Sequence, residues 1–141
     1  MPGGMRMVAL LLAALLPLGI GNCDRDERNS EPLSSGGPVL VPDWAGEQGF
    51  ADNPQAMRGA HIFAQAGCLN CHTYLGAGSS NLGAPDLSEI GRVNPRTAKG
   101  YAAYVSDPSR FGNQVMPRFQ ELGERNLLAL GAFLAASKSK R

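Results

Sequence analysis

The sequence predicts an all-α domain of about three to four helices, and two observations support this fold class. Three segments downstream of residue 53 repeat their apolar residues at the three- and four-residue intervals of a helix. No segment alternates apolar and polar residues convincingly, as a half-buried strand would. The 141 residues of the chain suffice for one small domain of this kind.

The first helix is expected to begin at Pro54 and to end before Gly67. Asn53 is a favourable N-cap, and proline is well tolerated at the first helical position because its missing N–H would be unpaired there anyway. Glycine commonly ends a helix. A single apolar stripe along this segment comprises Met57, Ala60, Phe63 and Ala64.

Two more helices are expected, over residues 97–106 and 124–138. The first of them has an apolar side and stops at Asp107, because the residue before a proline disfavours helical geometry. The second repeats leucines at helical spacing. Gly59 and Gly131 would allow the first and last helices to cross closely.

Residues 1–22 have the pattern of an export signal. One positive charge, Arg6, precedes thirteen apolar residues at 8–20. A membrane-spanning helix needs about 20 apolar residues and would be kinked by Pro17. The alternatives are a buried helix and an uncleaved anchor. We expect export to the extracytoplasmic, periplasmic side of a membrane.

The signal ends in Ile20-Gly21-Asn22-Cys23, which resembles the lipobox of bacterial lipoproteins, although Asn22 stands where Gly or Ala is usual. This resemblance implies that Cys23 is lipidated and anchors the mature chain to the membrane. Soluble release and an uncleaved anchor are the alternatives.

Residues 23–53 are expected to form a flexible acidic tether, with the folded domain at 54–141. The tether is rich in Pro, Gly and Ser, and its seven acidic residues and two arginines give a net charge of −5. An apolar cluster at 39–44 with the only tryptophan is unusual in a linker and could pack on the domain. Residues 54–141 carry a net charge of +5, whereas the whole chain carries +1, which argues against nucleic-acid binding.

Cys68-Leu69-Asn70-Cys71-His72 is a C-x-x-C-H motif, the attachment signature of haem c. Two cysteines at this spacing can form thioethers to the two vinyl groups of one haem, and the adjacent histidine can bind the iron. A zinc site would need further ligands, yet no Cys or His follows His72. A thioredoxin-like motif would need a βαβ context, and a disulfide would leave the histidine unexplained.

Haem iron in electron carriers commonly has a methionine opposite the histidine. Met116 is the only methionine after residue 72. We therefore expect His72 as the proximal and Met116 as the distal iron ligand. Met57 is expected to pack in the core, and His61 is the rival distal ligand.

With these motifs, residues 54–138 resemble the class I monohaem cytochromes c. The most specific parts are the C-x-x-C-H motif and Met116-Pro117; weaker support comes from residues 59–63, 83–87 and 91–92. The resemblance implies one covalent haem c wrapped by the helices. It also implies that the Pro85 carbonyl orients His72 and that Arg92 contacts a haem propionate.

The function implied is single-electron transfer without catalysis. The partners implied are redox proteins, such as a quinol-oxidising complex and a terminal oxidase or reductase. One alternative is a fixed haem c subunit of such a membrane complex, because residues 71–78 and 84–87 also resemble haem subunits of respiratory oxidases and nitric-oxide reductases. Another, a peroxidase or gas sensor, requires that Met116 does not bind iron.

Overall fold

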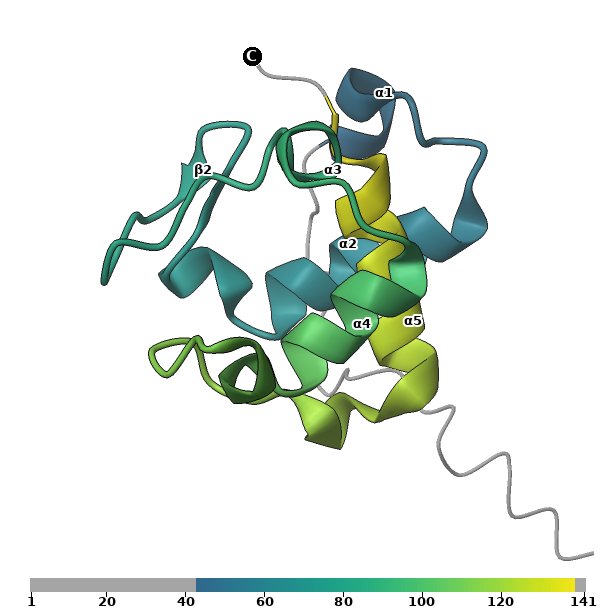
Figure 1. Ribbon diagram of the computed structural model, residues 1–141. Coiled ribbons are helices and arrows are strands. Elements are labelled where there is room, and N and C mark those ends of the chain that lie inside the picture. The colour runs from purple at the N-terminus through teal and green to yellow at the C-terminus, as the bar shows by residue number, and fades with distance from the viewer. Residues whose placement is uncertain (1–42, 139–141) are drawn as a thin grey trace, which may run out of the picture. The chain divides into compact units, whose positions relative to one another are not determined.

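The computed structural model describes residues 43–138, which form a helical domain (Figure 1). Helix α5 lies at its centre and packs against α2 and α4. The all-α prediction is confirmed. The helices are α1 (Trp44–Gln48), α2 (Pro54–Gln65), α3 (Ile90–Val93), α4 (Ala98–Ser106) and α5 (Gly123–Ala136), joined by 3-10 turns and a hairpin of β1 (Thr73–Tyr74) and β2 (Ala77–Gly78).

The predicted signal peptide, Cys23 and the tether up to residue 42 lie outside the described residues. Within residues 43–138, no helix combines the length and the apolar character needed to cross a membrane.

The boundaries of α2 and α4 follow from their capping residues. Asn53 Oδ1 accepts the N–H of Ala56 at 3.1 Å, and Thr97 Oγ1 accepts the N–H of Gly100 at 3.1 Å. Each bond satisfies a donor that the first helical turn leaves unpaired. The chain leaves α2 through Gly67, whose φ of 77° is costly for residues with a side chain.

Two glycines permit close helix crossings, one of them with a different partner from the one expected. A Cβ on Gly59 would lie 2.1 Å from the carbonyl oxygen of Ala129, so this glycine allows α2 to cross α5 closely, as predicted. A Cβ on Gly131 would lie 2.0 Å from the carbonyl oxygen of Ala98. Gly131 therefore serves the contact of α5 with α4, and the expectation that it serves the first helix is wrong.

The core contains a cluster of four aromatic rings from α1, α2, β1 and α5. Trp44 is 1% exposed, and its ring centroid lies 4.9 Å from that of Tyr74 and 6.1 Å from those of Phe63 and Phe133. Phe50 is also buried and packs against Phe133. The tether boundary at residue 53 is therefore wrong: the folded domain begins by residue 43, because α1 buries its tryptophan in the core.

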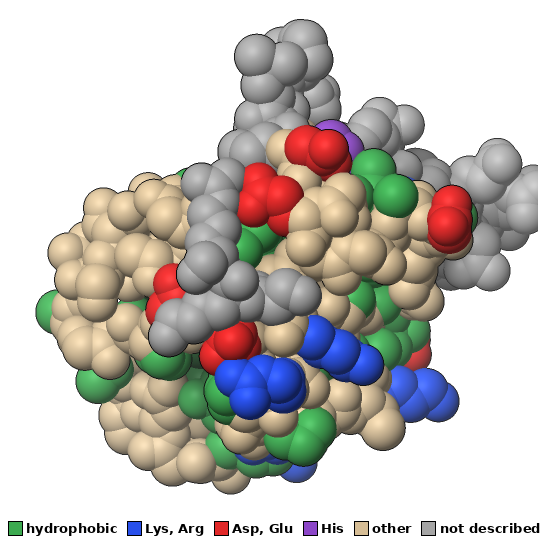
Figure 2. Space-filling view, turned by 90° about the horizontal axis from the view of Figure 1, so that it is seen from above, with side chains coloured by type: hydrophobic (Ala, Val, Ile, Leu, Met, Phe, Trp, Pro, Cys, Tyr) green, Lys and Arg blue, Asp and Glu red, His purple; other side chains and the backbone are tan. Residues whose placement is uncertain are grey.

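The new boundary changes the charge of the domain. Residues 43–138 contain eight basic and eight acidic residues, so the described domain has no net charge. The face shown in Figure 2 accordingly displays acidic and basic side chains together. The +5 of residues 54–141 leaves out Asp43, Glu47 and Asp52, which belong to the fold, and includes Lys140 and Arg141, which lie outside the described residues. Residues 43–141 together carry a net charge of +2.

The side chain of Gln48 connects α1 to two segments that are distant in the sequence. Its Nε2 donates to the carbonyl oxygen of Ser88 at 2.8 Å, and its Oε1 accepts the N–H of Lys138 at 2.9 Å. Gln48 is buried, so these bonds satisfy an amide that would otherwise be costly to remove from water. They fasten α1 to the loop before α3 and to the end of α5.

Replacing Trp44 with alanine tests whether α1 belongs to the domain. We expect Trp44→Ala to lower the free energy of unfolding by about 3–5 kcal/mol, because it opens a cavity between aromatic rings. Urea unfolding followed by circular dichroism measures this. Val93→Ala is the control, since Val93 is 60% exposed and its truncation should cost below about 0.5 kcal/mol. Equal small effects of both variants would contradict the placement of α1.

Candidate haem site

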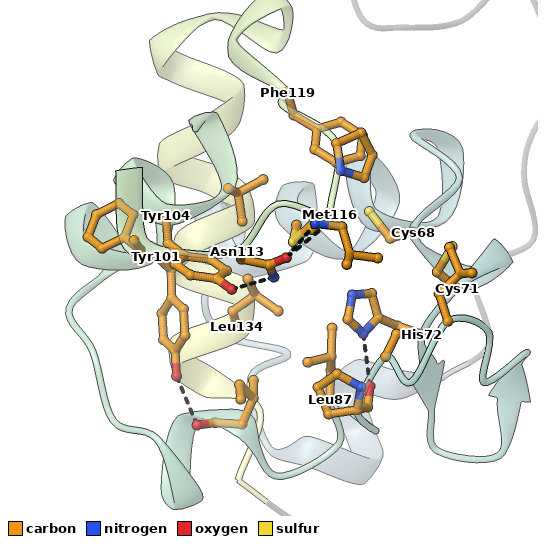
Figure 3. A pocket seen from close by; sticks show the side chains of 18 of the residues that line it. Cys68, Cys71, His72, Leu87, Tyr101, Tyr104, Asn113, Met116, Phe119 and Leu134 are labelled. Carbon is orange, nitrogen blue, oxygen red and sulfur yellow. Dashed lines mark hydrogen bonds between the residues drawn. The ribbon is translucent and has the colours of Figure 1, made fainter. Parts of the chain in front are cut away.

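A cavity of about 620 Å³ opens beside α4 and the C-terminal half of α5 (Figure 3). One wall carries Cys68, Cys71 and His72, which follow α2 in the chain. Met116 lines the cavity from the loop between α4 and α5. The structure thus brings together the four residues of the two sequence motifs. Several apolar or aromatic side chains also line the cavity, among them Leu87, Ile90, Tyr101, Val105, Phe119 and Leu134.

The turn after α2 sets the position of the two cysteines. Residues Cys68–Asn70 form one 3-10 turn, in which Cys71 N–H and His72 N–H both donate to the carbonyl oxygen of Cys68, at 3.2 and 2.9 Å. Neither thiol forms a disulfide. Burial raises the pKa of Cys68 to about 11, so its thiol is protonated at neutral pH before it is modified.

His72 is held by a backbone carbonyl. Its Nδ1 donates to the carbonyl oxygen of Pro85 at 2.8 Å, which leaves the other ring nitrogen facing the cavity on the side of Met116 (Figure 3). The Pro85 segment is itself fastened to β1, since Leu87 N–H donates to Thr73 O at 2.9 Å and Thr73 Oγ1 donates to Asp86 Oδ2 at 2.7 Å. The hydrogen bond to Pro85 therefore fixes the orientation of the imidazole ring and directs its other nitrogen into the cavity.

The rival ligands lie elsewhere. His61 is exposed on α2 and is not among the residues that line the cavity. Met57 is partly buried and packs against the core. Met116 is partly buried, and it lines the cavity.

Arg92 is not among the residues that line the cavity. Its guanidinium pairs with Glu89 on the surface. Arg96 lines the cavity instead, with its guanidinium carbon 5.4 Å from the ring centroid of Tyr104 and 5.9 Å from that of Phe111. Arg92 pairs with Glu89 because α3 is a single turn that begins directly after Glu89. The propionate contact of Arg92 stays a prediction.

Three residues that line the cavity were not predicted from the sequence as site residues. The cavity is also lined by Arg96, which precedes α4, by Tyr104, which lies near the end of α4, and by Asn113, which lies in the loop after it. Tyr104 lies in the segment 97–106, which was expected only to form a helix with an apolar side. Arg96 and Asn113 have no helical spacing, because both lie in loops.

The residues present fit a haem c. The rim carries large apolar side chains that are mostly in solvent, with Leu82 79% and Val115 65% exposed, as expected where a flat apolar group would cover them. The donor set of two thiols, one imidazole and one thioether matches covalent attachment and iron ligation. Among the described residues, no group of three or more His, Cys, Asp or Glu could hold a metal ion directly.

A helical domain with a C-x-x-C-H motif at the edge of an apolar cavity defines a protein that carries covalently attached haem. The sequence model of the Cytochrome c family matches residues 56–138, and the chain belongs to this family. It carries one haem c on Cys68 and Cys71, and it acts in electron transfer. The comparisons with curated proteins and with solved structures gave no match.

Proposed function

We propose that His72 and Met116 both bind the haem iron and that the chain is a single-electron carrier without catalytic activity. The observation that supports this is their arrangement about one cavity, with a ring nitrogen of His72 directed toward Met116. Two protein ligands leave no open position at which a small molecule could be activated. The bound haem supplies a centre that changes its oxidation state by one electron.

The side chains around the cavity have defined roles in this proposal. Pro85 fixes the tautomer and the ring orientation of His72. The thioether of Met116 raises the reduction potential relative to two histidines. The apolar side chains exclude water, and Arg96, which lines the cavity, is a second candidate beside Arg92 for contact with a haem propionate.

Replacing Met116 with alanine tests the proposed ligation. The oxidised wild-type protein should show the near-infrared methionine–iron charge-transfer band, and Met116→Ala should lose it. The reduction potential should fall by an amount on the order of 100 mV, within the ~0.8 V range that axial ligands span. Met57→Leu is the control and should leave both quantities unchanged. A wild-type protein without the band would favour a peroxidase or gas sensor.

We also propose that the domain works at the extracytoplasmic face of a membrane, held by a lipid on Cys23. Its partners would be a quinol-oxidising complex and a terminal oxidase or reductase. The export pattern of residues 1–22 and the lipobox-like residues 20–23 support the location. Because residues 43–141 carry a net charge of only +2, we expect partner docking to depend less on ionic strength than it would for a strongly basic domain.

Cys23→Ser tests the anchor. We expect at least about a tenfold shift of the haem protein from the membrane to the soluble fraction, since one or two acyl chains supply the binding. Mass spectrometry of the mature N-terminus identifies the modification, and an unmodified N-terminus beyond residue 23 would contradict it. Detergent extraction distinguishes a carrier from a fixed subunit, which would co-purify with large membrane subunits.

A further inference from the structure

We propose that Asn113, held by Tyr104, is the positioning residue that keeps Met116 on the iron. The proposal rests on the Met116 ligation proposed above and identifies what maintains it. It arises from the hydrogen bonds of the loop between α4 and α5.

The loop from Asn113 to Phe119 is anchored by backbone bonds at its two ends. Asn113 N–H donates to Pro108 O at 3.2 Å, and Phe119 N–H is shared between Val105 O at 3.3 Å and Ser106 O at 3.2 Å. Between these anchors, Val115 is 65% exposed, so burial contributes little to holding the outer side of the loop.

The carboxamide of Asn113 supplies the hydrogen-bond acceptor for the middle of the loop. Its Oδ1 accepts the N–H groups of both Val115 and Met116, each at 3.0 Å. This oxygen therefore fixes the backbone from which the Met116 thioether projects. Within residues 43–138, neither of these N–H groups donates to a backbone carbonyl.

Tyr104 holds the carboxamide in turn. Asn113 Nδ2 donates to the Tyr104 hydroxyl at 2.9 Å, and Figure 3 shows this bond beside Met116. The Tyr104 ring is fixed by α4, by Phe111 at 5.4 Å between centroids and by Arg96 above it. The amide is thereby oriented, with its oxygen toward the loop and its nitrogen toward a rigid helix. A thioether is a weak neutral ligand, so a loop held in place favours it over competing ligands.

Displacement of Met116 by imidazole measures this restraint in the oxidised holoprotein. Loss of the two bonds to Oδ1 should ease loop opening, so Asn113→Ala should bind imidazole about tenfold more tightly. The near-infrared band should weaken in parallel. Tyr104→Phe retains the ring and removes only the hydroxyl, and we expect this variant to bind imidazole about threefold more tightly than the wild type. Asn113→Asp retains the acceptor oxygens and should recover most of the wild-type affinity.

A matched control lies next to Asn113 in the same loop. Gln114→Ala removes a neighbouring amide that does not line the cavity and donates only to Ser109 O at 3.5 Å. Its imidazole affinity should stay within about twofold of that of the wild type. If Asn113→Ala folds poorly, Tyr104→Phe decides, because it leaves Asn113 in place. If Asn113→Ala folds, adding Tyr104→Phe to it should change the imidazole affinity little further.

Failure of this inference is distinguishable from failure of the proposed function. If Asn113→Ala and Tyr104→Phe both retain the near-infrared band and the imidazole affinity of the wild type, the role of Asn113 is overturned and the ligation by Met116 still stands. Absence of the band in the wild type, with no spectral effect of Met116→Ala, would overturn both.

Discussion

Replacing Cys68 and Cys71 together with serine is expected to yield a chain that carries no covalent haem and does not reach the native fold. Without the cofactor, the cavity of about 620 Å³ has no filling. Cavities in protein cores cost ~24 cal/mol per Å³. Even a third of that cost approaches the total stability of a small domain, about 5–15 kcal/mol. Haem staining of a denaturing gel measures attachment, and far-ultraviolet circular dichroism measures the helix content.

The third cysteine provides the control for this experiment. Cys23→Ser makes the same chemical change outside the described domain and should leave haem attachment and helix content unchanged. A double variant with native helix content and cooperative unfolding would show that the protein core suffices without haem.

Alanine at Gly59 or at Gly131 should cause a large loss of stability. In each case the new Cβ would lie about 2 Å from a backbone carbonyl oxygen of the partner helix, and a backbone atom cannot rotate away. The helices must separate, and we expect a cost of at least about 3 kcal/mol. For a domain of this size that corresponds to a Tm lower by roughly 15 °C. Thermal unfolding of the holoprotein measures it.

Gly100→Ala separates helix crowding from the general effect of replacing glycine. Gly100 lies in α4, and a Cβ there would meet only side-chain atoms at 3.4 Å. Alanine is the better helix former, so this variant should be as stable as wild type or gain up to about 1 kcal/mol. If all three alanine variants unfolded at the same temperature, the close crossings would not be structural constraints.

The helices were predictable because their signals are local. Asn53, Pro54 and Gly67 mark the ends of α2, and Asp107-Pro108 follows the last residue of α4. The attachment residues were predictable for the same reason, since Cys68, Cys71 and His72 are adjacent in sequence. The hairpin was not predicted, because strands of two residues are too short to show alternation.

The remaining differences depend on which segments meet in space. The tether boundary was misplaced because polar and breaker residues surround Trp44, whereas its burial depends on rings from three other segments. Similarly, the sequence offers two arginines four positions apart, Arg92 and Arg96. Only the path of the chain between α3 and α4 brings the second one to the cavity.

The contact between Gln48 and Lys138 also bears on the order of folding. It joins residues 90 positions apart, so forming it early would close nearly the whole described chain into one loop. Loop closure costs entropy that grows with length, and contacts this distant form more easily once nearer segments have paired. Helix α1 is therefore expected to dock last, after α2, α4 and α5 have assembled. Protection of its amides against hydrogen exchange would then mark the completed fold.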